Sequence, residues 1–298
     1  MTRAVSESSR LGILSEAADA LEREGIESAR NDAEWLLAAV LGLERFGLYL
    51  DHARTLSPAE ATRYRDLVAR RAARVPLQHL LGFEEFYGLR FCVTRDVLIP
   101  RPETEGLVRW ALERLPESGA VVADVGTGSG AIACALAQNR PSLRVLAVER
   151  SLPALAIAAF NVQRLGLSRR VRVVAGDLLA PFAPGSLDLV IANPPYIPTA
   201  LVASLPPEVS RFEPRQALDG GPDGLAVLRR LIAEAASVLQ RGGWLMMEIG
   251  EEQAGPLASL LAAEGFTGIE ARRDLAGRER YITGQWPEPS APTPRRTC

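Results

Sequence analysis

Residues 123–137 read ADVGTGSGAIACALA, and this stretch decides the fold expected for the chain. Its first residues have the apolar character of a buried strand, and residues 131–138 have the pattern of a helix. Between them stand Gly126, Gly128 and Gly130, where glycine lets the backbone turn tightly and approach a ligand closely, with the helix N-terminus behind it. A strand that turns through glycines into a helix predicts the first unit of a parallel sheet.

Further apolar runs alternate with helical patterns toward the C-terminal region. The expected strands are VVADVG, LRVLAVE, VRVVAG, LDLVIAN and WLMMEIG, followed by a closing pair near Phe266 and Tyr281. Helices fit between them, notably at 152–165 and 225–239. Strand and helix in alternation predict an α/β domain with a mostly parallel, doubly wound, Rossmann-like sheet.

The residues before this sheet predict a separate, smaller domain. Apolar residues recur there at helical spacing, and Ser57, Pro58 and Glu60 stand where a helix N-cap, a first helical position and a capping box require them. Aromatic and β-branched residues around Gly88 predict a hairpin. We therefore expect four parts: a helical bundle at 1–81, a hairpin linker at 82–103, the Rossmann-like domain at 104–286 and a disordered tail at 287–298.

Composition and charge exclude several classes of site. The chain has 298 residues and a net charge of −2, without the basic excess of proteins that bind phosphate backbones, so no direct nucleic-acid binding is expected. Its three cysteines lack the spacing of metal ligands, which argues against a zinc site or a disulfide framework. No apolar stretch is long enough to span a membrane, and we expect a cytoplasmic protein. The arginines of residues 63–74 could bind an acidic partner, but a solvated helix face is the commoner meaning of such a run.

Acidic residues follow the next two predicted strands, and they indicate the ligand of the glycine turn. Glu149 stands where a carboxylate can accept hydrogen bonds from both hydroxyls of a ribose. The turn lacks the G-x-G-x-x-G spacing of dinucleotide sites, and a Walker A loop needs a lysine, which the chain lacks. S-adenosylmethionine fits better, with its adenine near Asp177 and Leu178. Its methionine end would lie over the turn formed by Gly126, Thr127, Gly128, Ser129 and Gly130.

A fourth strand ends in Asn193, Pro194, Pro195 and Tyr196, and the prolines make this strand end rigid. In an open parallel sheet it lies beside the crevice where ligands bind. The side-chain oxygen of Asn193 and the carbonyl of Pro194 can together accept both protons of a planar NH2 group, and Tyr196 can pack on its face. We therefore expect Asn193 and Tyr196 to serve methyl transfer to an amide or arylamine nitrogen. The alternative is a rigid turn with a chance tyrosine.

GTGSG combined with NPPY resembles the amino-methyltransferases, which act on adenine N6, cytosine N4, guanine N2 or glutamine side chains. The longer stretches PLQHLLGFEEFYG, VLIPRPETE and EPRQALDGGPDGL resemble the protein-(glutamine-N5) methyltransferases of the HemK or PrmC type. The resemblance extends to about Trp286. It implies the Rossmann-like fold of class I S-adenosylmethionine-dependent methyltransferases, with S-adenosylhomocysteine as the product.

The resemblance also implies a substrate and several residue roles. The acceptor would be the glutamine of the Gly-Gly-Gln loop of peptide chain release factors, and the N-terminal helices would help to hold that partner. Residues 126–130, Glu149, Asp177 and Leu178 would bind the cofactor, Asn193 would lie beside it, and RPETE would lie close by. Many relatives carry aspartate in place of Glu149, and some carry an aromatic residue in place of Leu178.

Two other functions stay open at this stage. The first is a nucleic-acid amino-methyltransferase acting on adenine N6 or guanine N2 of a flipped base. The second is a protein that binds S-adenosylmethionine without catalysis, although such a protein would be expected to have lost the NPPY motif. The glycine-rich loop at 212–225 is expected to order over the site, or else to be a plain surface crossover.

Overall fold

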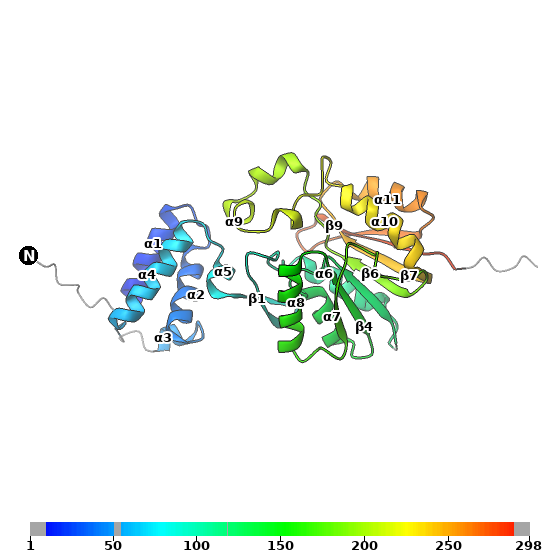
Figure 1. Cartoon of the computed structure of the whole chain (residues 1–298). Coiled ribbons are helices and arrows are strands. Elements are labelled where there is room, and N and C mark those ends of the chain that lie inside the picture. The colour runs from blue at the N-terminus through cyan, green and yellow to red at the C-terminus, as the bar shows by residue number, and fades with distance from the viewer. Residues whose placement is uncertain (1–9, 51–54, 118, 289–298) are drawn as a thin grey trace, which may run out of the picture. The chain divides into compact units, whose positions relative to one another are not determined.

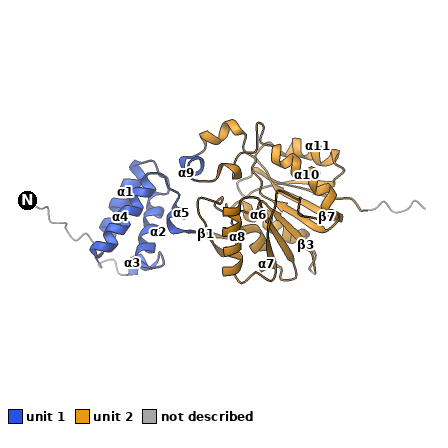
Figure 2. Ribbon diagram, viewed as in Figure 1, with its two compact units in different colours: residues 1–83, 206–212 blue, residues 84–205, 213–298 orange. Residues whose placement is uncertain are grey.

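The structure, a computed structural model, describes residues 10–50, 55–117 and 119–288. Two compact units make up this part of the chain (Figure 2). Unit 1 contains the residues up to Phe83 together with 206–212, and unit 2 contains 84–205 and the residues from Glu213 onward. The hairpin region thus groups with unit 2, and a segment from the second half of the chain groups with unit 1. The expected tail lies outside the described residues from position 289 onward.

Unit 1 is helical, as the spacing of its apolar residues predicts. Its helices are α1 (Arg10–Arg23), α2 (Ala29–Leu41), α3 (Gly47–Leu50), α4 (Pro58–Ala72), α5 (Leu77–Leu81) and α9 (Pro207–Ser210) (Figure 1). The capping box is confirmed, because Glu60 N donates to Ser57 Oγ at 3.3 Å and Ser57 N donates to Glu60 Oε2 at 2.8 Å. Fully buried leucines such as Leu14, Leu21 and Leu36 form the core of this unit.

The arginine-rich helix of unit 1 is only partly a solvated face. Arg71 is 6% exposed, and its Nε lies 2.7 Å from Asp32 Oδ2. The Nη1 of Arg71 donates to Glu208 Oε1 at 3.0 Å, and Arg74 Nη2 donates to Glu208 Oε2 at 2.9 Å. Because Glu208 stands on α9, these ion pairs attach the segment 206–212 to the helical unit.

Unit 2 is built on a seven-stranded sheet. Its strands are β3 (Val121–Val125), β4 (Arg144–Glu149), β5 (Val171–Ala175), β6 (Leu187–Ala192), β7 (Leu239–Glu248), β8 (Thr267–Arg273) and β9 (Glu279–Gln285). They lie in the order β5-β4-β3-β6-β7-β9-β8, with β3 to β7 parallel and β9 antiparallel to both of its neighbours. The predicted mostly parallel, doubly wound sheet is confirmed.

Helices cover both faces of this sheet (Figure 1). One apolar cluster includes residues of α6 (Thr104–Arg114), α7 (Ala131–Asn139) and α8 (Leu152–Arg164), and a second includes residues of α10 (Ala226–Val238) and α11 (Ala254–Ala263). The turns η1 (Thr199–Ser204) and η2 (Arg215–Ala217) follow β6. Since parallel strands end at one edge, Val125, Glu149, Ala192 and Glu248 lie along the same edge.

The predicted hairpin consists of β1 (Phe83–Phe86) and β2 (Leu89–Cys92). Its two central residues, Tyr87 and Gly88, both have positive φ, at 51° and 73°, as a tight two-residue hairpin turn requires. Asn161 of α8 is fully buried and connects β2 to the glycine turn. Its Oδ1 accepts from Cys92 N at 2.8 Å and its Nδ2 donates to Ser129 O at 2.9 Å.

Two classes of feature are absent from the part of the chain that the structure describes. None of its helices is long and apolar enough to cross a membrane. Within the same residues, no three or more His, Cys, Asp or Glu side chains gather as a metal site would require. Cys92 and Cys134 are free thiols, and Cys134 is buried.

Candidate active site

The glycine turn leaves open space above its backbone. Gly126, Gly128 and Gly130 have φ values of 72°, 55° and 83°, which lie in the left-handed region that favours glycine. A Cβ at Gly126 would meet no atom within 4 Å, so a ligand has room there. Gly130 has a different place: it precedes α7, and a Cβ there would touch Ala158 of α8 at 3.6 Å.

The carboxylate of Glu149 is held in place by two backbone amides. Oε2 accepts from Gly128 N at 3.1 Å and Oε1 accepts from Ser151 N at 2.9 Å. Glu149 is 8% exposed and lines the pocket beside the turn. Each carboxylate oxygen has further lone pairs, so the group can accept from two ligand hydroxyls in an orientation that is already fixed.

Asp124 supports the glycine turn from the buried side, a role that was not predicted from the sequence. Its Oδ2 accepts from Thr127 Oγ1 at 2.5 Å and from Ala133 N at 3.0 Å, which ties the turn to the first residues of α7. Its Oδ1 is buried and has no hydrogen-bond partner among the residues that the structure describes. Burial raises the pKa of Asp124 to about 7. Asp124 therefore stabilises the turn from within the fold.

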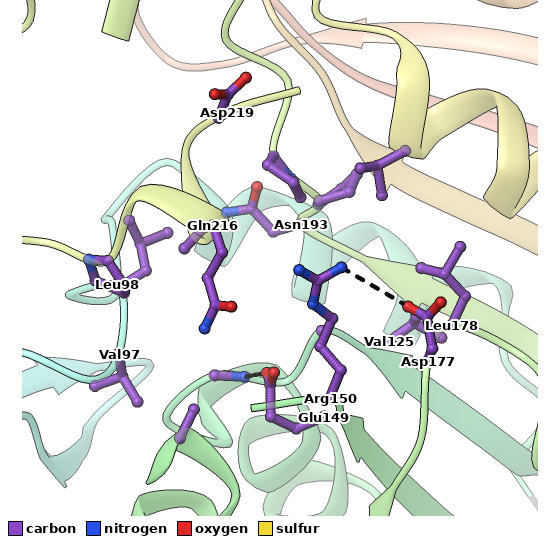
Figure 3. A pocket seen from close by; sticks show the side chains of 18 of the residues that line it. Val97, Leu98, Val125, Glu149, Arg150, Asp177, Leu178, Asn193, Gln216 and Asp219 are labelled. Atoms are coloured by element: carbon purple, nitrogen blue, oxygen red, sulfur yellow. Dashed lines mark hydrogen bonds and ion pairs between the residues drawn. The ribbon is translucent and has the colours of Figure 1, made fainter. Parts of the chain in front are cut away.

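A pocket of about 190 Å³ lies at the carboxyl ends of the parallel strands (Figure 3). It brings together most of the residues expected to bind cofactor and substrate. Those in its lining are Gly126, Gly128, Glu149, Asp177, Leu178, Asn193, Pro194 and Pro195. A smaller adjoining cavity of about 50 Å³ is lined by Thr127 and Ser129, and also by Arg101 and Thr104 of RPETE. Gly130 and Tyr196 are in neither lining.

Asp177 and Leu178 lie to the right of Glu149 in Figure 3, beyond Arg150. Asp177 Oδ2 accepts from Arg230 Nη2 at 2.8 Å, and Arg150 Nη1 lies 4.0 Å from its other oxygen. Leu178 has a φ of 48°, a conformation that a non-glycine residue rarely adopts. Such strain is typical of residues whose position serves a site.

Asn193 lines both cavities, and a hydrogen-bond chain behind it determines how its amide points. Its Nδ2 donates to Thr104 Oγ1 at 3.2 Å, and Thr104 Oγ1 donates to Glu248 Oε2 at 2.6 Å. The Oδ1 of Asn193 is therefore available to accept from a substrate. Thr104 belongs to RPETE, which was expected close to the cofactor, but its link to Asn193 and the part of Glu248 were not predicted, because these residues are far apart in the chain and no spacing rule connects them.

Tyr196 has contacts other than the expected ones. Its hydroxyl donates to Glu248 Oε1 at 3.3 Å, and its ring packs against the apolar cluster that includes α10 and α11. Burial, followed by the negative charge of Glu248, raises the pKa of Tyr196. Tyr196 is in the lining of neither cavity, and its expected contact with the face of a substrate amide stays a prediction.

Backbone hydrogen bonds attach the glycine-rich loop to Ile197, the residue that follows NPPY. Ile197 N donates to Leu218 O at 3.1 Å and Gly220 N donates to Ile197 O at 2.8 Å. A Cβ at Gly220 would lie 2.8 Å from the carbonyl oxygen of Pro195, so only glycine permits this approach. The loop thereby places Pro214, Gln216, Ala217 and Asp219 in the pocket lining.

Comparisons with solved structures identify the fold. The catalytic domain of hMettl16 in complex with a MAT2A 3'UTR hairpin is 17% identical and covers 86% of this chain and 94% of that chain, with a TM-score of 0.58. A methyltransferase from Pyrococcus furiosus is 16% identical and covers 76% of this chain and 99% of that chain, with a TM-score of 0.51. At these identities the likeness shows a methyltransferase fold and nothing finer.

Family models and curated relatives identify the family of the chain. Residues 12–82 match the PrmC N-terminal domain and residues 108–203 match the methyltransferase small domain. The release factor glutamine methyltransferase of Geobacter sulfurreducens is 46% identical over 89% of this chain and 92% of its own length. The corresponding protein of Moorella thermoacetica is 46% identical over 90% and 95%, and that of Mycolicibacterium smegmatis is 44% identical over 92% and 97%. The chain therefore belongs to the family of release factor glutamine methyltransferases.

Proposed function

We propose that this chain transfers a methyl group to the side-chain amide nitrogen of a glutamine in peptide chain release factors. The glutamine would be the one in their Gly-Gly-Gln loop, and S-adenosylmethionine is the methyl donor. The observation that carries the proposal is Asn193, whose Nδ2 donates to Thr104 Oγ1 at 3.2 Å and so leaves its Oδ1 as an acceptor, in a pocket also lined by Pro194 and Glu149. Family membership supports the same substrate.

The residues of the pocket fit S-adenosylmethionine. Glu149 would accept from the ribose hydroxyls, Asp177 and Leu178 would contact the adenine, and the open space over Gly126 would take the methionine end. When bound, the cofactor supplies a methyl group on a positively charged sulfur.

The glutamine amide is a weak nucleophile because its nitrogen lone pair is delocalised, so positioning must supply much of the catalysis. Asn193 Oδ1 and the Pro194 carbonyl would each accept a hydrogen bond from one N–H of the amide. Both hydrogen bonds would strengthen as positive charge develops on the nitrogen. Bound S-adenosylmethionine would supply the methyl group, and the glutamine nitrogen would give up one proton to solvent, so the products would be N5-methylglutamine and S-adenosylhomocysteine.

We also propose that unit 1 takes part in holding the release factor. Its described surface carries large exposed apolar side chains, Phe46 at 72% and Leu50 at 70% exposure. Phe46 directly precedes α3 and Leu50 ends it, so both are available on the same short segment for contact with a partner.

Methyl transfer to purified components tests the main proposal. The protein is incubated with labelled S-adenosylmethionine and a release factor, and the loop peptide is analysed by mass spectrometry before and after the reaction. We expect one methyl group on the loop glutamine and none on a release factor in which that glutamine is replaced by asparagine. Label in DNA or RNA, with none in the release factor, would overturn the proposal.

A further inference from the structure

We infer that Thr104 and Glu248 are positioning residues that fix the amide of Asn193 with its oxygen toward the substrate. The inference rests on the proposed function and adds two residues to its site. Neither side chain is proposed to touch the glutamine or the cofactor; both act through Asn193.

The three residues come together from separate elements of unit 2. Asn193 follows β6, Thr104 is the first residue of α6, and Glu248 is the last residue of β7. Thr104 is 4% exposed and Glu248 is 1% exposed, so water does not compete freely for their hydrogen bonds. Two hydrogen bonds connect them: Asn193 Nδ2 donates to Thr104 Oγ1 at 3.2 Å, and Thr104 Oγ1 donates to Glu248 Oε2 at 2.6 Å.

When Glu248 is ionised, the numbers of donors and acceptors allow only one arrangement of these two hydrogen bonds. A carboxylate only accepts hydrogen bonds, so the single hydroxyl proton of Thr104 must go to Glu248. The Thr104 oxygen can then only accept, and Asn193 must turn its NH2 group toward it. This leaves Oδ1 of Asn193 on the pocket side, where the proposed clamp needs an acceptor.

Protonation of Glu248 removes this constraint. The groups that face Glu248 are Thr104 and Glu103 at the start of α6, Tyr196 after β6, and Arg280 and Tyr281 of β9. Burial is the main cause that raises the pKa of Glu248 to about 7; Glu103 raises it further, whereas Thr104 and Arg280 lower it. A protonated Glu248 can donate to Thr104, whose hydroxyl can then donate to Asn193. The amide can now face either way, so the fraction of correctly oriented Asn193 falls as pH falls below about 7.

Variants of Thr104 test the inference in the full chain. Thr104→Val removes the hydroxyl at nearly constant volume, and Thr104→Ser restores it. Thr283→Val is the matched control, because Thr283 is also fully buried and its hydroxyl donates to Leu245 O at 2.8 Å without a link to Asn193. For each protein we would measure single-turnover methylation of the release factor, the Kd of S-adenosylmethionine and thermal unfolding.

We expect Thr104→Val to lose about 10- to 100-fold in rate, with cofactor Kd unchanged within about 2-fold. Thr104→Ser should recover most of the rate, and Thr283→Val should keep it. The ratio of the wild-type rate to the Thr104→Val rate should shrink from pH 8 to pH 6, because protonation of Glu248 disturbs the orientation of the Asn193 amide only in the wild type. Asp124 titrates in both proteins, so its effect cancels in this ratio.

Three results would overturn the inference: a normal rate for Thr104→Val, equal losses in the valine and serine variants, or a rate ratio that does not change with pH. A wild-type protein that fails to methylate the release factor would instead refute the proposed function. The two failures are therefore distinguishable in one set of measurements.

Discussion

The backbone amide of Gly128 donates to Oε2 of Glu149 at 3.1 Å, so the glycine turn and the expected ribose acceptor form one preorganised unit. Ser151 N holds the other oxygen of the same carboxylate at 2.9 Å. Preorganisation of this kind lowers the entropy lost when a ligand binds.

Replacing Glu149 should therefore weaken cofactor binding strongly. Glu149→Ala loses two expected hydrogen bonds to ribose, each worth roughly 1.5 to 3 kcal/mol with a charged acceptor, so we expect Kd to rise at least about 100-fold. Titration calorimetry with S-adenosylmethionine measures this. Glu251→Ala is a control, because that side chain is exposed and its carboxylate lies 3.9 Å from Arg278 Nε. An unchanged Kd for Glu149→Ala would remove this residue from the site.

Asn193→Ala should affect methyl transfer far more than cofactor binding. It removes one of two proposed acceptors at the reacting nitrogen, and we expect turnover to fall on the order of 100- to 1000-fold. Asn193→Asp keeps an oxygen but adds a negative charge near the sulfonium, so it should bind cofactor at least as tightly and still react slowly. Single-turnover rates and cofactor Kd, with Asn139→Ala as a control at the exposed end of α7, provide the comparison. Near-normal methylation by Asn193→Ala would mean that NPPY is only a turn.

Asp124 should make stability depend on pH. Its pKa is raised from 3.8 to about 7 by burial, so between these values the folded state binds more protons than the unfolded state. Its stabilising contribution is thus complete below pH 4 and is lost as pH rises toward 7. Asp124→Asn cannot titrate. We expect the free energy of unfolding of the wild type to fall relative to this variant by about 1 kcal/mol per pH unit in that window.

Urea unfolding at several pH values measures that difference in the absence of cofactor. Glu248 titrates in both proteins and therefore cancels in the comparison. A difference that stays constant between pH 5 and pH 7 would show that Asp124 does not carry the raised pKa.

Arg71→Met should destabilise unit 1. The variant leaves Asp32 buried without its partner, and loss of one member of a buried ion pair costs about 3 to 5 kcal/mol. Arg70→Met is the matched control, because Arg70 is exposed and lies 3.9 Å from Asp66; we expect a change within about 0.5 kcal/mol. Thermal or urea unfolding of both variants gives the result. Equal stabilities would contradict a role for the Arg71–Asp32 pair.

Phe46→Ser should impair recognition of the whole release factor but not the chemistry. We expect KM for the release factor to rise about 10-fold, as for loss of a large apolar contact at an interface, with kcat and cofactor Kd unchanged. Methylation of a short glutamine peptide should not change. Leu275→Ser is the control on unit 2, since Leu275 is 98% exposed. An unchanged KM would place recognition elsewhere.

Features that depend on neighbouring residues were predictable from the sequence. The glycine turn, the capping box of Ser57 and Glu60, and the alternation that produces the parallel sheet all follow local rules of spacing. The position of Glu149 could also be predicted, because strand ends of a parallel sheet meet at one edge. Asp124 was visible in ADVG as an acid among apolar residues, a pattern that indicates a buried and therefore hydrogen-bonded carboxylate.

Features made by distant residues were not predictable. Thr104, Asn193 and Glu248 meet only after three elements have packed, and no periodicity connects them. The packing of the Tyr196 ring against the apolar cluster that includes α10 and α11 also depends on distant residues, and its expected contact with the substrate stays a prediction. The burial of Arg71 likewise depends on Asp32 and on Glu208, far away in the chain.

The return of residues 206–212 to unit 1 has a consequence during protein synthesis. A nascent chain that has just passed residue 83 already contains the Arg71–Asp32 pair, but Glu208 is still untranslated. Arg71 and Arg74 gain their last carboxylate only after β3, β4, β5 and β6 have emerged from the ribosome. The helical unit can therefore begin to fold early, in the N-terminal-first order of synthesis, yet it is completed only after most of the parallel strands have been made.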